Sequence, residues 1–258
     1  MIRAWRSSCA VRAVRGLHAD GVRAAACDNG GVTILRTLRD RMRRDDPNAF
    51  HTPLTLLAPA DAPAIRLRTM TAADEDEWDQ VRIRNAAWLE PWDSNDPERH
   101  RSVTFPQWIH MQRRDERSGS AIVFVIEYDG RIVGQISLGA VMFGAMRSGI
   151  IGYWIDQDYA GRGFTPLAVT MLADWAMLDP DGPRLHRVEI DLVPQNERSR
   201  RVVQKIGAKY EGIRRKYMYI NGHWRDHESY SLLAEDAPDG FTRRLIGDTP
   251  GERVSSLS

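Results

Sequence analysis

Residues 151–167, IGYWIDQDYAGRGFTPL, carry the strongest structural signal in this chain. The segment begins with apolar residues typical of a buried strand, continues through a loop with Gly161 and Gly163, and reaches an expected helix start near Thr165. Glycine allows a tight turn and a close approach between backbone and ligand. The start of a helix adds unpaired N–H groups and a positive dipole end. We therefore expect residues 161–165 to hold a diphosphate.

Two common phosphate-binding motifs are absent from this loop. A dinucleotide fingerprint needs a third glycine where Pro166 stands, and a P-loop needs Gly-Lys-Ser/Thr. A Gly-x-Gly turn alone is also consistent with an ordinary tight turn. A second segment, residues 187–212, narrows the interpretation with the sequence RVEIDLVPQNERSRRVVQKIGAKYEG. It predicts a strand that stops at Pro194, a helix beginning near Asn196 and Ser199, and another strand.

The rest of the chain predicts an α/β fold built on one mixed sheet. Apolar alternation and glycine-containing turns indicate the strands, and helical spacing with polar helix starts indicates the helices. The expected strands are residues 65–70, 121–128, 131–138, 150–156 and 187–193, with two more around Asn221 and Gly222. The expected helices are residues 71–86, 105–117, 165–178 and 197–206.

Composition excludes several classes of protein. Of 258 residues, 42% are hydrophobic and 28% are charged, as in typical globular chains. No apolar run reaches the roughly 18 residues that span a bilayer. Both cysteines, Cys9 and Cys27, lie near the N-terminus. This excludes a disulfide framework, a cysteine-based zinc site and a cysteine nucleophile in the main body, and we expect a cytoplasmic protein without a membrane partner.

Charge is distributed unevenly between the N-terminus and the rest. Residues 1–44 carry a net charge of +7, and the remaining residues carry −6. An acidic body is a poor candidate for a nucleic-acid enzyme, so any nucleic-acid contact is expected only through residues 1–44. We expect a disordered basic extension and Pro-rich linker over residues 1–63, one domain over 64–236 and a polar tail over 237–258. The extension is open to three interpretations: a presequence, an RNA-binding arm, or a translation start placed too far upstream.

The two glycine- and asparagine-containing segments together resemble the GNAT superfamily of N-acetyltransferases, which use acetyl-CoA. The family motif is Arg/Gln-x-x-Gly-x-Gly/Ala, and here Asp158 stands at its first position. That departure removes one side chain from the phosphate site and leaves the backbone intact. The resemblance implies a mixed, mostly antiparallel sheet with helices on both faces. It also implies that the sheet is splayed between the strands at 150–156 and 187–193.

Further segments resemble the ribosomal-protein-alanine N-acetyltransferases of the RimJ type. They are YMYINGHWRDH at 217–227 with YSLL at 230–233, WLEPW at 88–92, GSA at 119–121 and NERS at 196–199. The likeness covers about residues 65–235. It implies an acyltransferase that acetylates a protein N-terminal α-amine, with a ribosomal protein as a candidate partner. Two alternatives stay open: acetylation of a small amine such as an aminoglycoside, amino acid or polyamine, and a catalytically decayed acyl-CoA sensor.

The resemblance also implies roles for individual residues. A backbone N–H within Tyr153, Trp154 and Ile155 would bind the thioester carbonyl, and Asn196 would bind the arm of acetyl-CoA. The expected phosphate-binding residues are Gly161, Arg162, Gly163, Phe164 and Thr165. Ser199 would bind near the sulfur and act as the general acid, unless it only satisfies backbone groups in the first helical turn.

The general base is not assigned by the sequence. Relatives can place a glutamate where this chain has Met218. A water reached by Glu90, Glu98, Glu189 or Asp226 is one alternative. Deprotonation at pH 7 costs about 1.4 kcal/mol for an α-amine and about 4.6 kcal/mol for lysine. A site without an evident strong base therefore favours an α-amine acceptor.

Two further groups of side chains have competing interpretations. Trp88, Glu90 and Trp92 lie between the first two expected helices, where this superfamily builds its acceptor pocket. The alternative is that both tryptophans fill an edge of the core. His223 and His227 share a strand face, but no further ligand of Cys or His type accompanies them, so we expect no metal site.

Overall fold

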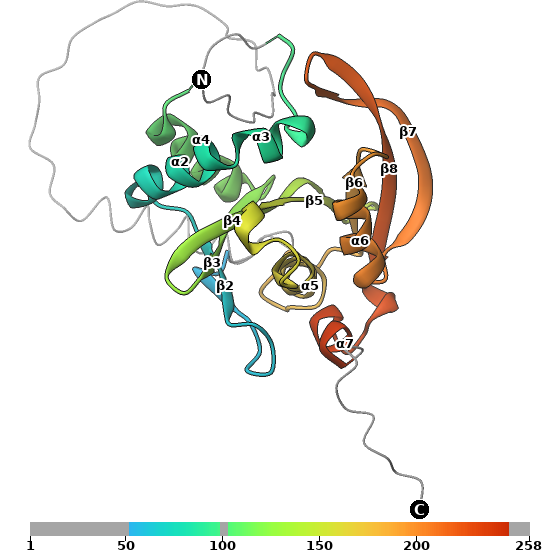
Figure 1. The fold of residues 1–258 in the computed structure, drawn as a ribbon. Helices are drawn as coiled ribbons and strands as arrows, with labels where there is room; N and C mark the ends of the chain where they lie inside the picture. The colour runs from blue at the N-terminus through green and yellow to red at the C-terminus, as the bar shows by residue number, and fades with distance from the viewer. Residues whose placement is uncertain (1–51, 99–102, 248–258) are drawn as a thin grey trace, which may run out of the picture. The chain divides into compact units, whose positions relative to one another are not determined.

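The computed structural model describes residues 52–98 and 103–247 (Figure 1). The predictions for residues 1–51 and 248–258 lie outside this part of the chain. The strands within it are β1 (Thr55–Leu57), β2 (Ile65–Thr69), β3 (Ile122–Tyr128), β4 (Arg131–Met142), β5 (Ser148–Ile155), β6 (Arg187–Leu192), β7 (Lys209–Ile220) and β8 (His223–Leu233). The α-helices are α2 (Glu75–Arg84), α3 (Ala86–Leu89), α4 (Phe105–Ser118), α5 (Phe164–Met177), α6 (Glu197–Lys205) and α7 (Phe241–Gly247). Short 3₁₀ helices are η1 (Ala72–Asp74), η2 (Glu90–Trp92), η3 (Gln157–Tyr159) and η4 (Ala234–Asp236).

The strands of the described part form one sheet in the order β1-β2-β3-β4-β5-β6-β8-β7. Neighbouring strands are antiparallel except β5 and β6, which are parallel. Two tight hairpin turns have positive φ at both central residues, at Asp129 and Gly130 and at Asn221 and Gly222. Such turns match the twist of the strands they join. The predicted mixed, mostly antiparallel sheet is confirmed.

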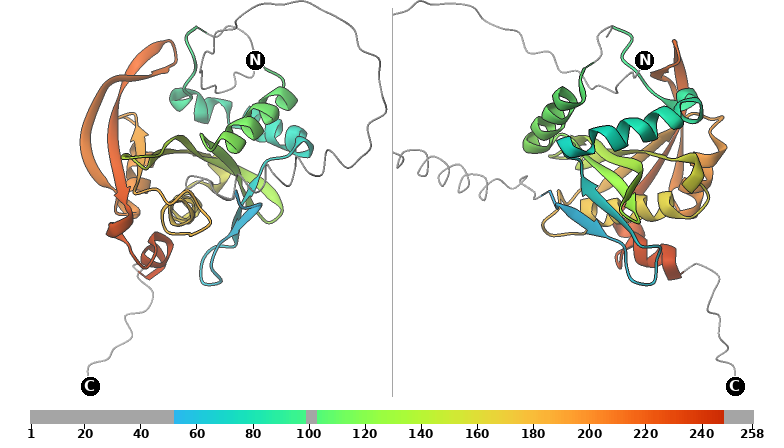
Figure 2. Two further views of the ribbon diagram at one scale, coloured as in Figure 1. Left: turned by 180° about the vertical axis from the view of Figure 1, so that it is seen from behind. Right: turned by 60° about the vertical axis from the view of Figure 1, so that its left-hand side comes forward.

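Helices cover both faces of the sheet, as predicted (Figure 2). On one face, which we call the α5 face, α5 packs on a large cluster that includes Phe124, Ile136 and Ile190. On the other, which we call the α4 face, residues of α2 and α4 pack on Val125 and Ile132. Alternation along a strand sends successive side chains to opposite faces, so each strand contributes to both layers.

The parallel strands β5 and β6 separate after a short common ladder. Their pairing covers Ser148 with Arg187, Gly149 with Val188 and Ile150 with Glu189, and no further register is formed. Both strands continue, β5 to Ile155 and β6 to Leu192. The predicted splay between these two strands is therefore confirmed, and we call the space between their diverging ends the strand opening.

Two predicted boundaries are wrong. Residues 55–57, assigned to the linker, form β1 and pair antiparallel with β2. Residues 241–247, assigned to the polar tail, form α7, and Phe241 is fully buried. Neither element was predicted, because the prolines and charges around them are typical of linkers and tails. Each element is also short and depends on a partner distant in sequence. The ordered fold therefore extends at both ends beyond residues 64–236.

Candidate active site

The loop between β5 and α5 leaves its backbone open to a ligand. Gly161 and Gly163 have φ values of +81° and +82°, in the left-handed region that favours glycine. A Cβ atom built on either residue meets nothing within 4 Å. Gly163 is the N-cap of α5, where the first N–H groups lack helical partners and the dipole favours an anion. The loop therefore fits the diphosphate of coenzyme A.

The side chains of this loop mostly face away from that space. Phe164 and Thr165 are buried, and the Phe164 ring lies 4.7 Å from the ring of Tyr128. Of these two residues, only the backbone N–H groups can therefore contribute to the phosphate-binding loop, which we call the phosphate cradle (residues 161–165). Arg162 is exposed and donates to the carbonyl of Asp158 at 2.9 Å. Asp158, which departs from the family motif, thus positions the Arg162 side chain through its backbone carbonyl.

A buried carboxylate anchors the loop to α2. Asp156 accepts hydrogen bonds from Arg84 Nε at 2.9 Å and from the Asp158 N–H at 3.2 Å. Asn85 accepts the N–H of Gln157 at 2.9 Å. Burial alone would raise the pKa of Asp156, but Arg84, Asn85 and the Asp158 N–H together lower it below its usual value. Sequence reasoning missed this anchor, although an aspartate directly after a buried apolar strand was its signal.

The backbone of β5 presents N–H groups to the strand opening. The Asp156 N–H donates to Val133 of β4 at 2.8 Å. Because the direction of these groups alternates along a strand, Trp154 also faces β4, whereas Tyr153 and Ile155 face the opening. Beyond Ile150, no described strand pairs with this edge of β5, so the N–H groups of Tyr153 and Ile155 have no partner in the sheet. Of the three expected residues, Tyr153 and Ile155 fit the carbonyl-binding role, and Trp154 instead packs its ring against the α4-face cluster.

Two hydroxyl groups meet across the opening. Tyr153 Oη and Ser199 Oγ are 2.7 Å apart. Asn196 Oδ1 caps α6 by accepting the Ser199 N–H at 3.1 Å. The Ser199 hydroxyl therefore bonds to tyrosine and not to the backbone of its helix turn. Burial raises the pKa of Tyr153, against an opposing effect of the Ser199 hydroxyl, so the phenol stays protonated at neutral pH.

Trp88 joins the two sides of the opening. Its Nε1 donates to the Ile155 carbonyl at 3.0 Å, and the Arg198 guanidinium of α6 lies 3.8 Å from its ring centroid. Trp92 is half-buried and Glu90 is exposed. Neither tryptophan belongs to either apolar cluster of the described residues, which does not match the core-edge interpretation. The loop after η2 then reaches β7, where the Asn95 N–H donates to the Tyr219 carbonyl at 3.0 Å.

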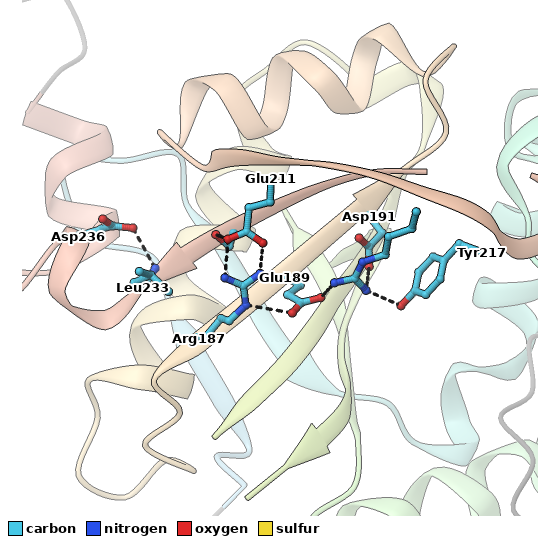
Figure 3. A network of polar contacts seen from close by, with 9 residues as sticks. Arg187, Glu189, Asp191, Glu211, Tyr217, Leu233 and Asp236 are labelled. Carbon is cyan, nitrogen blue, oxygen red and sulfur yellow. Dashed lines mark hydrogen bonds and ion pairs between the residues drawn. The ribbon is translucent and has the colours of Figure 1, made fainter. Parts of the chain in front are cut away.

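The carboxylates considered as bases from the sequence have other partners or lie at the surface. Glu189 forms ion pairs with Arg187 and Arg214 (Figure 3). Asp226 is 44% exposed and accepts the Lys216 N–H. Glu90 and Glu98 are exposed. None of these four carboxylates combines burial with an unpaired oxygen.

Sequence reasoning missed one buried carboxylate on β6. Asp191 Oδ2 lies 3.4 Å from Arg214 Nη1, and its Oδ1 is buried without a hydrogen-bond partner among the described residues. Figure 3 shows Asp191 near Tyr217 at one end of the polar network. Nearby His227 is buried, and burial lowers the pKa of its imidazole. The available signal was the polar alternation Arg187, Glu189, Asp191 in a central strand.

The described residues contain no group of three or more His, Cys, Asp and Glu that could hold a metal ion. Within the same ranges, no helix has the length and apolar character needed to cross a membrane. His223 and His227 each place Nδ1 about 3 Å from a backbone carbonyl, at 3.0 and 3.1 Å. Their spacing follows from the hairpin that they share.

Comparison with known families agrees with this geometry. A family model described as Acetyltransferase (GNAT) domain matches residues 64–209, more than half of the chain. The chain belongs to the GNAT acetyltransferase family. It is an N-acetyltransferase of RimJ-like type that uses acetyl-CoA as its acetyl donor.

Individual GNAT proteins resemble the chain over most of the described part. The [ribosomal protein uS5]-alanine N-acetyltransferase of Escherichia coli is 27% identical over 194 residues, covering 70% of this chain and 97% of that protein. The structure of Mycobacterium smegmatis RimJ in complex with CoA-disulfide is 31% identical, covers 75% of this chain and 93% of that one, and has a TM-score of 0.68. A third match, to the probable N-acetyltransferase YjcK of Bacillus subtilis, is 38% identical over 108 residues and spans 42% of this chain but only 58% of the relative.

Proposed function

We propose that this GNAT enzyme acetylates the N-terminal α-amine of a protein, with a ribosomal protein as the acceptor. The observation that carries the proposal is the similarity to the uS5-alanine N-acetyltransferase over 97% of that protein's length. The splayed strands and the open glycine loop supply a donor site consistent with it.

The chemistry of the acceptor supports the same class. An amine must be neutral before it attacks a thioester, and an α-amine with a pKa near 8 gives up its proton more readily than a lysine near 10.4. At pH 7 the difference is about 3 kcal/mol in favour of the α-amine. A protein N-terminus is therefore the acceptor that requires the weakest base.

Each residue of the site has a role in this proposal. Residues 161–165 hold the diphosphate of acetyl-CoA through backbone N–H groups, and Asn196 Nδ2 binds its arm. Acetyl-CoA supplies an activated acetyl group as a thioester. The N–H groups of Tyr153 and Ile155 bind the carbonyl oxygen as it gains negative charge. Ser199 protonates the leaving thiolate, and its bond to Tyr153 keeps a second proton donor in reach.

Trp88 and Trp92 are proposed to border the acceptor. Trp88 is fixed between β5 and α6, which gives the entrance a rigid wall. Glu90 is exposed beside it and can meet a cationic acceptor. A small amine would use the same residues, so the acceptor panel below includes both classes.

Thiol release from acetyl-CoA tests the proposal directly. The panel contains Ala-, Ser- and Met-initiated peptides from ribosomal proteins, the same peptides with blocked N-termini, aminoglycosides and polyamines. We expect turnover with a free N-terminus and none with its blocked match, and mass spectrometry should place the acetyl group on the α-nitrogen. Turnover restricted to small amines would replace the proposed acceptor. Tight acetyl-CoA binding without any turnover would instead indicate the decayed sensor.

A further inference from the structure

Asp191 borders the strand opening on the α4 face. It lies two residues beyond Glu189, the last residue of β6 that pairs with β5. Val188, Ile190 and Leu192 belong to the cluster on the α5 face, so alternation places the Asp191 side chain on the opposite face. Ser199 and the Tyr153 side chain lie on the α5 side, where α5 and the phosphate cradle also lie. This leaves the α4 face, on which Asp191 lies, as the side that we assign to the acceptor amine.

The Asp191 carboxylate is held through one oxygen and unpaired at the other. Its side chain is 0% exposed, and Arg214 lies 3.4 Å from Oδ2. The Ser229 hydroxyl of the paired strand β8 lies close enough to lower the pKa of Asp191. Neither Asp191 Oδ1 nor Ser229 Oγ has a regular hydrogen-bond partner among the described residues. A buried acceptor without a donor costs free energy, and most such groups in proteins are satisfied. An unpaired oxygen beside a reaction site indicates a place for a donor from the substrate.

Charged and titratable groups from three strands face this carboxylate. They are Glu189 on β6, Arg214 and Tyr217 on β7, and His227 on β8. Burial raises the pKa of Asp191 and Glu189 adds to the rise, whereas the nearby Ser229 hydroxyl, Arg214 and His227 oppose it. A carboxylate with a raised pKa accepts a proton more readily than an ordinary aspartate.

We infer that Asp191 is the general base of this acetyltransferase, with Oδ1 accepting a proton from the ammonium group of the acceptor. The nitrogen lone pair then forms the N–C bond with the thioester carbonyl carbon, and the C–S bond breaks with its electron pair on sulfur. Ser199 gives the thiolate a proton. The nitrogen loses a second proton as the amide forms, and this proton replaces the one that Ser199 gave up. One net proton passes from the ammonium through Asp191 to solvent. The inference rests on the proposed amine acetylation and not on which amine is the acceptor.

The test compares Asp191→Asn with Asp191→Glu and with the control Asp61→Asn, at an exposed aspartate in the turn between β1 and β2. For Asp191→Asn we expect kcat/KM at pH 7 to fall about 10²-fold or more, the usual contribution of a general base. The loss should shrink as pH rises past the pKa of the amine, because the acceptor then arrives neutral. Asp191→Glu should recover part of the activity, and Asp61→Asn should keep the wild-type profile.

A readout without turnover accompanies the kinetics. In the complex with coenzyme A, a carboxyl carbon resonance that is missing from Asp191→Asn should shift when an Ala-initiated peptide, or the amine that the panel identifies, is added. The inference is overturned if Asp191→Asn keeps wild-type kcat/KM across the pH range. A uniform loss at every pH, with lower melting temperature and weaker coenzyme A binding, would assign Asp191 a purely structural role. Failure of the ribosomal peptides would overturn only the proposed acceptor, because the variants can be compared with any amine that is acetylated.

Discussion

The hydroxyl groups of Ser199 and Tyr153 come from side chains distant in sequence, and we propose that they act together as the proton donor. Ser199 lies in the first turn of α6, and Tyr153 lies on the diverging end of β5. Their 2.7 Å contact closes the α5 side of the strand opening. Because burial raises the pKa of Tyr153, its phenol stays protonated at neutral pH and can donate a hydrogen bond to Ser199.

Replacing Ser199 with alanine should slow acetyl transfer without weakening donor binding. We expect kcat to fall by about 10²-fold, since the nearer of two proton donors is removed and Tyr153 remains. Steady-state kinetics measure kcat, and calorimetry with coenzyme A measures affinity. Ser118→Ala, at the exposed end of α4, is the control. An equal loss of coenzyme A affinity would contradict the proton-donor role.

Gly161→Ala separates backbone strain from ligand contact. Gly161 and Gly130 both have left-handed φ, +81° and +70°, and open space where a Cβ would lie. Each alanine variant should therefore lose about 1–2 kcal/mol of unfolding free energy. Only Gly161→Ala should also weaken coenzyme A binding, because Gly130 lies in the β3–β4 turn. Chemical denaturation and calorimetry give the two quantities, and equal coenzyme A affinity in both variants would argue against the phosphate cradle.

Helix α7 illustrates how one element depends on another. The Asp174 carboxylate of α5 accepts the N–H of Phe241 at 2.6 Å and of Thr242 at 3.0 Å. Arg244 of α7 donates to the Ile206 carbonyl at 2.6 Å, just after α6. The same helix α5 that begins at the phosphate loop therefore also anchors the C-terminal end of the described fold.

Asp174→Ala should release α7 from α5. The two N–H groups lose a charged acceptor at a helix start, and we expect a loss of about 1–2 kcal/mol in unfolding free energy. Urea denaturation measures it, with Asp239→Ala, an exposed aspartate before α7, as the matched control. Unchanged stability of Asp174→Ala would mean that burial of Phe241 alone holds the helix.

Across the fold, buried and half-buried ion pairs join strands of the sheet to one another and β2 to the short helix η1. Arg68 of β2 contacts both Asp74 and Glu127. Burial would raise the pKa of both carboxyls, but the Arg68 guanidinium lowers each below its usual value. On β7 the ion pair with Arg187 lowers the pKa of Glu211 to about 2. These carboxylates are more acidic in the folded protein than in the unfolded chain.

Stability should therefore decrease in acid. A carboxyl with a lowered folded-state pKa contributes its full stabilisation above its unfolded pKa of about 4, and loses it as pH falls through the folded value. The unfolding free energy should drop steadily from about pH 5 toward pH 2, following the proton uptake on unfolding. Asp74→Asn should start lower at pH 7 and show a shallower decrease. Parallel curves for the two proteins would exclude Asp74 as a source of the acid dependence.

Local patterns accounted for most of the elements and for part of the site. The glycine loop, the turn at Asn221 and the capping Asn196 were predictable because each depends on a few adjacent residues. Asp191 and β1 were missed for the opposite reason. From the sequence, Asp191 has the pattern of a surface residue in an alternating strand, because the side chains of β7 and β8 that surround it are distant in sequence. Similarly, β1 is a strand only because it pairs with the edge of β2.

The amino-acid sequence by itself determined most of the order of elements and the glycine turn before α5, because turn geometry, helix starts and apolar periodicity are short-range properties. The splay between β5 and β6 was expected only from the resemblance to GNAT proteins. Tertiary structure alone decided which polar groups share the strand opening. Tyr153 and Ser199 are paired there, Trp88 bridges its sides, and Asp191 keeps one oxygen unpaired. Burial and charge at a site are sums over neighbours contributed by different strands, and those neighbours exist only once the sheet has formed.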